Sequence, residues 1–153
     1  MVSNIIKVQQ EDFDISGLNA LIRDDDGSHG AIVTFTGIVR EMASGPGLVA
    51  MELEHYPGMT EKSLEKIALQ ARERWDLGPI VIVHRVGRLA LNDNIVFVGV
   101  ASPHRVAGFA AAQFIMDYLK RDAPFWKKEI TEQGENWVAA KDSDLARADS
   151  WDT

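Results

Sequence analysis

The pattern of apolar and polar residues along the chain predicts several short strands. Residues 5–8 and 30–40 (GAIVTFTGIVR) are rich in β-branched and aromatic side chains, which is typical of buried strands. Residues 48–56 (LVAMELEHY) alternate between apolar and charged positions and predict a half-buried strand. Residues 80–91 (IVIVHRVGRLAL) and 95–102 (IVFVGVAS) predict two more strands, which the short turn NDN joins.

Helical spacing of apolar residues appears in three segments. Residues 15–22 predict a modest helix, and residues 57–75 (PGMTEKSLEKIALQARERW) predict the clearest one, with Thr60 as its N-cap. A third helix opens at SPHR, where Ser102 can cap it and Pro103 suits its first position. We expect four side chains of this helix to face the core: Phe109, Ala112, Met116 and Leu119.

The end of the chain predicts a hairpin followed by a polar tail. KKEIT and NWVAAK are joined across EQG, and residues 142–153 form the tail. With 153 residues and neither repeat nor linker, residues 1–153 fit a single domain. Most consecutive strands are joined too briefly for parallel crossovers, so we expect an α+β fold with mixed or antiparallel sheets.

Composition excludes several classes of function. A net charge of -7 and a pI near 5.0 argue against broad nucleic-acid binding, which depends on basic surface. No apolar run approaches the ~20 residues of a membrane span, and the N-terminus does not resemble a targeting peptide, so we expect a cytoplasmic protein. The sequence has no cysteine, which excludes disulfides, thiolate ligands and a thiol nucleophile. Any sulfur used by this protein must therefore be imported.

A local basic cluster stands out in this acidic chain, in the segment YLKRDAPFWKKE (residues 118–129). Lys120 and Arg121 end a predicted helix, where cations are favoured by the helix dipole whether or not they bind a ligand. Lys127 and Lys128 would point to opposite faces of a strand, so one of them can point inward. A desolvated lysine beside another cation can act as an acid, base or nucleophile, whereas a solvated strand start is the simpler interpretation.

Two further polar residues, His104 and Arg105, lie at the start of the third helix, whose free N–H groups attract anions. They can also be ordinary surface residues near a cap. Lys120 ends the same helix roughly 24 Å away, so a neighbouring element or a second protomer must bridge that distance if they share a site. The sequence therefore indicates an anion site built from Arg40, His104, Arg105, Lys120 and Lys127, while His55 and His84 are interpreted as structural. The four histidines lack zinc-ligand spacing, and no glycine-rich phosphate loop or Gly-x-Ser-x-Gly elbow is present.

The same segments resemble a known family. In order and spacing, the sequence is similar to the large, catalytic subunit of molybdopterin synthase from about residue 26 to about residue 141. The stretches HYPGMTE and APFWKKE are the most specific. The segments that carry the resemblance are VTFTGIVR, LEHYPGMTEKSL, IVIVHRVG, IVFVGVASPHR and FIMDYLKRDAPFWKKE.

The resemblance implies an α+β fold of the hammerhead type and a homodimer that forms a heterotetramer with two small ubiquitin-like subunits. It implies that the chain converts cyclic pyranopterin monophosphate to molybdopterin in molybdenum cofactor biosynthesis, as a sulfurtransferase. Two sulfurs would arrive as thiocarboxylates on the C-terminal glycine of the small subunit, which fits a chain without cysteine. We expect no metal, no cofactor, no nucleic acid and no membrane partner.

The resemblance also implies the site residues. Lys120 and Lys127 would be catalytic. The substrate-binding set would be Ile38 and Val39 through their backbones, with Arg40, His104, Arg105, Lys128, Glu129 and Lys141. Relatives often have lysine at the position of Ile38, so only a backbone role carries over to this residue. Where a relative has arginine, this chain has Lys141, which keeps the positive charge. Because the family pocket lies near the dimer interface, His104 and Arg105 can act from the same protomer or from the second one.

Two other functions fit parts of the sequence. A non-enzymatic adaptor could bind a ubiquitin-like tail through a basic groove and a sheet edge, and it would need no pterin pocket. A lysine Schiff-base lyase would act on a carbonyl substrate without a partner protein. Binding of the pterin by this chain alone would distinguish the enzyme from the adaptor, and borohydride trapping would reveal the lyase.

Overall fold

A computed structural model describes residues 3–23, 27–41, 47–138 and 142–152. The centre of this part of the chain is a four-stranded sheet with the order β1-β4-β6-β2. β1 pairs with β4 in parallel, whereas β6 pairs antiparallel with both β4 and β2. Its strands are β1 (Asn4–Gln9), β2 (Ala31–Ile38), β4 (Ile80–Arg85) and β6 (Asn94–Ser102).

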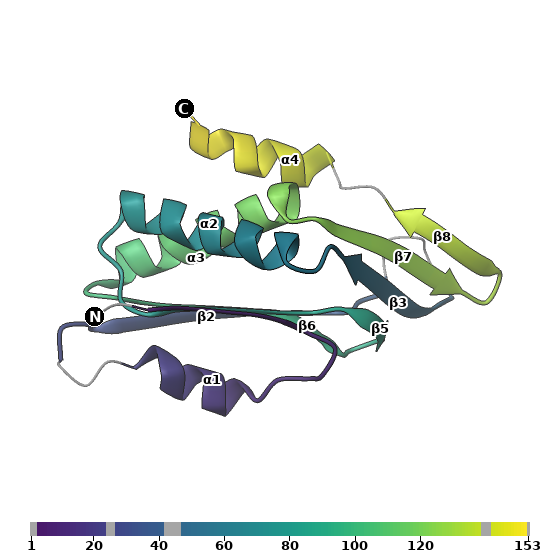
Figure 1. The fold of residues 1–153 in the computed structure, drawn as a ribbon, viewed down its shortest axis with the longest axis horizontal. Helices are drawn as coiled ribbons and strands as arrows, with labels where there is room; N and C mark the ends of the chain where they lie inside the picture. The colour runs from purple at the N-terminus through teal and green to yellow at the C-terminus, as the bar shows by residue number, and fades with distance from the viewer. Residues whose placement is uncertain (1–2, 24–26, 42–46, 139–141, 153) are drawn as a thin grey trace.

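Helices cover both faces of this sheet (Figure 1). α2 (Met59–Arg74) and α3 (Arg105–Asp122) pack on one face, and α1 (Ile15–Ile22) packs on the other. Neighbouring residues of β4 alternate between these layers: Ile80 and Ile82 join the α2/α3 core, whereas Val81 and Val83 join the α1 core. Burying each such side chain stabilises the fold by ~1.5–3 kcal/mol. No helix in the described ranges is long and apolar enough to cross a bilayer.

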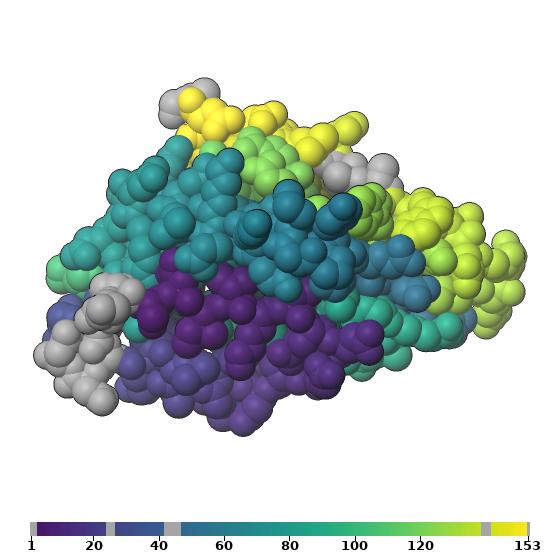
Figure 2. Space-filling view, viewed as in Figure 1, coloured from purple at the N-terminus to yellow at the C-terminus, as the bar shows by residue number. Residues whose placement is uncertain are grey.

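A second, antiparallel sheet with the order β5-β3-β7-β8 extends from one end of the first (Figure 1). Figure 2 shows the β7–β8 hairpin projecting from that end of the molecule. The predicted α+β class and the C-terminal hairpin are therefore confirmed. The strands of this sheet are β3 (Leu48–His55), β5 (Gly87–Ala90), β7 (Phe125–Thr131) and β8 (Gly134–Val138).

The prediction of one strand over residues 80–91 was wrong. The segment forms β4 in the first sheet and β5 in the second, and the chain changes sheets at Val86 and Gly87. Gly87 has φ 87°, a left-handed conformation that glycine adopts without the steric cost of a side chain. Because β4 and β5 belong to different sheets, this glycine sets the junction between them.

The predicted N-caps were also wrong. α2 has Gly58 as its N-cap, and the hydroxyl of Thr60 instead donates to the Tyr56 carbonyl at 3.0 Å. Ser102 is the last residue of β6, and its hydroxyl donates to the carbonyl of His104, which is the N-cap of α3. Each hydroxyl fixes the chain just before its helix without capping it.

Phe109 does not face the core as predicted. Its side chain is 63% exposed, and Val106 on the same helix is 74% exposed. Gly108 packs against Val33 of β2, so this end of α3 lies close to that edge strand. Phe35 lies two residues after Val33 and so shares its face of β2, and it is also partly exposed. We refer to Phe35, Val106 and Phe109, which are exposed on β2 and on the nearby start of α3, as the apolar patch.

Residues 142–152 form α4 (Asp142–Asp149) and a short 3-10 helix, η1 (Ser150–Asp152), where a polar tail was predicted. Trp151 packs edge-on against Trp75 and Phe114, with ring centroids 5.7 and 5.5 Å apart. Its indole N–H donates to Asp117 at 2.8 Å, which anchors the segment on α3. One aromatic side chain and one buried carboxylate therefore hold a segment whose composition is polar.

Candidate active site

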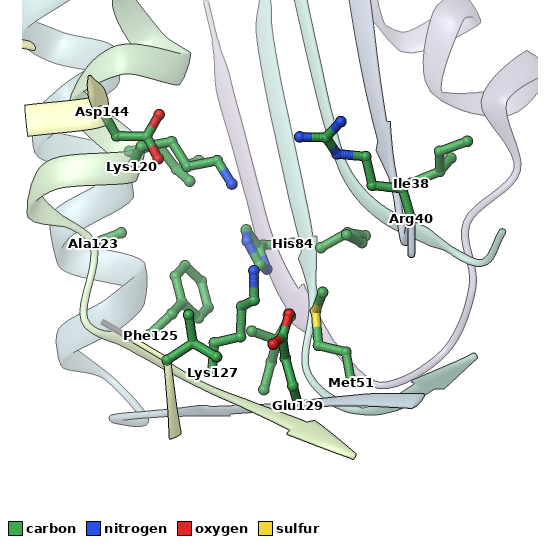
Figure 3. Close-up of a pocket in the computed structure, with 14 residues that line it drawn as sticks. Ile38, Arg40, Met51, His84, Lys120, Ala123, Phe125, Lys127, Glu129 and Asp144 are labelled. Atoms are coloured by element: carbon green, nitrogen blue, oxygen red, sulfur yellow. The ribbon is translucent and has the colours of Figure 1, made fainter. Parts of the chain in front are cut away.

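A pocket of about 320 Å³ lies where the C-terminal end of α3 meets both sheets (Figure 3). Its walls come from α3, from the end of β2, and from β3, β4 and β7, so the site depends on the whole fold. The lining residues include apolar side chains, three cations, one histidine and two carboxylates. The polar ones are Arg40, His84, Lys120, Lys127, Glu129 and Asp144.

Lys120 reaches the pocket from the last turn of α3. The helix ends where the Ala123 N–H bonds to Leu119, and Pro124 then redirects the chain into β7. Arg121, the next residue, points elsewhere. It forms ion pairs with Asp122, Asp149 and Asp152 at 2.7, 3.1 and 3.5 Å, and hydrogen bonding to Asp122 raises its pKa further. Of these two adjacent cations, only Lys120 faces the pocket.

Lys127 and Glu129 line the pocket from β7 because alternate residues of a strand share a face. Their partners across the strands are Leu53 and Met51 of β3, which also line the pocket. Glu129 is only 1% exposed. This confirms the prediction that Lys127 and Lys128 point to opposite faces and that one of them points inward.

Lys128 lies on the outer face of the small sheet. Its ammonium is 3.8 Å from Glu52 and 3.4 Å from Glu135, and it lies 4.7 Å from the ring centroid of Trp137. Trp126, on the same face, is 50% exposed, whereas Phe125 packs inward. The structure therefore does not bring Lys128 into the pocket with Lys127.

Arg40 follows β2 and lines the pocket together with Ile38. Figure 3 shows both side chains on the wall opposite α3. Val39 between them is buried, and both of its backbone groups are already bonded: its N–H donates to Asp93 and its carbonyl accepts from Asn92, each at 2.9 Å. The backbone of Val39 is thus held by the turn before β6, which leaves Ile38 and Arg40 at the pocket.

His84 is a pocket residue that sequence reasoning interpreted as structural only. It is 5% exposed and stacks on Phe125, with the ring centroids 3.8 Å apart and the planes at 19°. Burial lowers its pKa to about 4, the hydrogen bond to Arg85 partly opposes this, and the positive charges of Lys120 and His55 lower it further. A histidine directly after the apolar run IVIV, within the same strand, was the one signal that could have indicated this role.

Besides Val39, four predicted site residues do not line the pocket or are not described. His104 and Arg105 are exposed at the opposite end of α3 from Lys120, so one chain does not bring them into the pocket. Lys128 is on the outer face, and Lys141 lies outside the described residues. The structure brings together Ile38, Arg40, Lys120, Lys127 and Glu129.

This arrangement is suited to anions. Three cations from three different elements surround one pocket, and apolar residues such as Leu53 and Phe125 reduce the access of water. Ammonium and guanidinium groups in such a site stabilise both a bound anion and negative charge that develops during a reaction. Within the described ranges, no three histidine, aspartate or glutamate side chains converge as a metal site requires.

Comparison with known proteins identifies the family. The model of the family described as MoaE protein matches residues 8–122. The molybdopterin synthase catalytic subunit of Salmonella typhimurium is 57% identical over 129 residues, which are 84% of each chain. The solved structure of the molybdopterin biosynthesis MoaE protein from Burkholderia ambifaria has a TM-score of 0.84 and 48% identity over 99% of both chains. Molybdopterin synthase from Staphylococcus aureus has a TM-score of 0.81 and 34% identity, covering 87% of this chain and 96% of its own. This chain therefore belongs to the MoaE family of molybdopterin synthase catalytic subunits.

Proposed function

We propose that the pocket around Arg40, Lys120 and Lys127 is the active site of a sulfurtransferase. In it, cyclic pyranopterin monophosphate becomes molybdopterin, and two sulfurs come from the thiocarboxylated C-terminus of a small ubiquitin-like subunit. The observation that carries this proposal is the convergence of three cations on a pocket of about 320 Å³ in a chain with a net charge of -7. Two anions, a phosphate ester and a thiocarboxylate tail, would meet there.

The cations divide between these two anions. Arg40 lies on the wall formed by the end of β2 and presents a planar guanidinium, which suits a phosphate. Lys120 and Lys127 face the opposite part of the pocket, where they would stabilise the thiocarboxylate and the charge that develops as sulfur adds to the pterin side chain. One of the two would also transfer a proton. Lys127 shares its face of β7 with Glu129, which is only 1% exposed.

The sulfur source is tested by reconstitution. The chain has no cysteine, so purified protein with the pterin substrate should form no dithiolene product. The small subunit with an ordinary C-terminal carboxylate should restore the complex but not the product. Only the thiocarboxylate form should yield molybdopterin, with about two small subunits consumed per product because each carries one sulfur atom. Product from this chain alone, or with the carboxylate form and no other sulfur donor, would refute the proposal.

We further propose a cytoplasmic homodimer that binds one small subunit at each end. The apolar patch of Phe35, Val106 and Phe109 lies beside His104 and Arg105, and exposed apolar patches are typical of interfaces. A second protomer seated on this patch would carry its own His104 and Arg105 to a neighbouring pocket, which a single α3 cannot do. Phe109→Glu should therefore yield monomers in sedimentation and weaken substrate binding. Unchanged dimers in this variant would exclude the patch as the interface.

A further inference from the structure

The two ring nitrogens of His84 have different surroundings. Nδ1 lies 2.8 Å from the backbone carbonyl oxygen of Arg85. A carbonyl oxygen only accepts hydrogen bonds, so Nδ1 carries the proton and Nε2 carries a lone pair. The hydrogen bond to the backbone thus fixes the tautomer, and stacking on Phe125 fixes the plane of the ring.

Nε2 of His84 is accessible from the pocket. It has no hydrogen bond with any residue that the structure describes. Among buried side-chain nitrogen and oxygen atoms in those residues, only Nδ1 of His55 lacks a partner. Nε2 is therefore not a buried, unpaired atom, and the open space beside His84 is the pocket that it lines. The lone pair of Nε2 therefore faces the pocket, and the ring that carries it is held in one orientation.

Two ammonium groups point toward this ring. Figure 3 shows His84 in the middle of the pocket, with the side chains of Lys120 and Lys127 directed toward it from α3 and β7. Burial is the main cause that lowers the pKa of His84, and the positive charge of Lys120 lowers it further. Nε2 of His84 carries no negative charge. It can therefore orient the ammonium group of Lys120 or Lys127 without neutralising that group.

We propose that His84 is a positioning residue. The ammonium group of Lys120 or Lys127, which lines the same pocket, rotates to donate a hydrogen bond to Nε2, and this bond directs the remaining N–H groups at the bound anions. A carboxylate in this place would form an ion pair and would reduce the attraction for the anions. A neutral nitrogen adds no negative charge beside the lysine. The expected effect of His84 on turnover rests on the proposed function. The hydrogen bond between His84 and a lysine can be tested whether or not that function is correct.

Nitrogen-15 NMR of the histidine rings tests the hydrogen bond directly. In the unmodified protein at neutral pH, His84 should show a protonated Nδ1 and an unprotonated Nε2. Lys120→Met or Lys127→Met should shift the Nε2 resonance, because the apolar side chain removes the donor. The variant that shifts it identifies the lysine. A protonated Nε2, or a resonance that neither variant moves, would overturn the proposal.

Two substitutions at His84 separate positioning from packing. Glutamine places an amide oxygen near the position of Nε2, whereas asparagine places its amide near Nδ1 and leaves the pocket without an acceptor. We expect His84→Asn to lower kcat by about 10- to 100-fold with little change in KM, and His84→Gln to retain most of the activity. Equal losses in both variants would mean a packing role only.

His55→Gln is the matched control, because His55 lies near His84 but does not line the pocket. It should keep near-normal turnover. If a His84 variant fails to fold, the NMR result on the unmodified protein and the lysine variants still decides the proposal. If Lys120→Ala and Lys127→Ala keep full activity, the proposed function fails while the NMR result stands.

Discussion

Both faces of the small sheet lie beside cations, but within the described ranges only Lys128, on the outer face, is paired with carboxylates on both neighbouring strands. On the outer face, Lys128 is compensated by Glu52 and Glu135 and lies over Trp137. On the pocket side, neither Lys120 nor Arg40 has an ion pair with any residue that the structure describes. Ion pairs at a protein surface contribute about 0–1 kcal/mol to stability, so we expect the partly exposed pairs of Lys128 to contribute little. Lys120 and Arg40 therefore remain available for an anion, and this difference from Lys128, not charge content, marks the site.

The largest effect that separates the two faces is on turnover. Lys120→Ala and Lys127→Ala should each lower product formation by about 100-fold or more, because these side chains act on charge that develops during the reaction. Lys128→Ala and Arg121→Ala are matched controls, since each removes a neighbouring cation that points away from the pocket. They should stay within about threefold of the parent. Steady-state assays with the thiocarboxylated partner measure all four, and similar losses in all would remove the distinction between the faces.

The second effect concerns acid stability. The pKa of His84 is lowered to about 4 in the folded chain, mainly by burial, whereas the unfolded chain titrates near its ordinary 6.5. Between these pH values His84 is protonated in the unfolded state but not in the folded state. The free energy of unfolding therefore decreases as the pH falls from about 6.5 to about 4. The loss should be about 3 kcal/mol in the free energy of unfolding.

Urea unfolding at pH 7.5 and pH 4.5 measures this loss. His84→Gln should show a smaller decrease than the parent chain, because glutamine does not titrate. The outer-face pairs of Lys128 should contribute little to the difference. An identical decrease in parent and variant would show that His84 is not the group responsible.

A third effect should appear in substrate binding. Arg40→Ala should raise KM by about 10-fold or more with a smaller change in kcat, because a charge-assisted hydrogen bond to the phosphate is lost. Arg40→Lys should recover part of the affinity, since it keeps the charge and loses the planar fork. A large loss of kcat at unchanged KM would contradict the phosphate role of Arg40.

The smallest effect should come from the outer face itself. Glu52→Gln should lower the free energy of unfolding by at most about 1 kcal/mol, because Lys128 retains Glu135 and the ring of Trp137. Chemical unfolding in low and high salt measures this effect, which salt should reduce further. A loss of several kcal/mol would mean that the outer charges are structural after all.

Local rules predicted the elements that have strong local signals. The spacing of apolar residues predicted the helix at residues 15–22, and the alternation of side chains along a strand predicted that Lys127 or Lys128 points inward. Both rules depend only on nearby residues. The change of sheets at Gly87 was missed, because an apolar run gives no indication of which sheet it joins. α4 was missed because its stability comes from Trp151 and Asp117, which are far apart in the sequence.

The cations of the candidate site could be predicted from the sequence, whereas His84 could not. Arg40, Lys120 and Lys127 stood out as charges beside turns, and the structure brings these three together. His84 was interpreted as structural because its strand is buried, and only the fold shows that one edge of the ring reaches the pocket. Phe109 was assigned to the core because helical period cannot distinguish a core face from an exposed apolar patch.

The central claim is that the C-terminal carboxyl group of the small subunit docks between Lys120 and Lys127. Carbodiimide cross-linking of the complex, with the carboxylate form of the partner, tests this most directly, because it joins a carboxyl group to an amine only when they touch. Peptide mass spectrometry should find the partner's terminal glycine linked to Lys120 or Lys127. Linkage instead to Lys128, Lys62 or Lys66, or a stable complex with no link to either pocket lysine, would contradict the account.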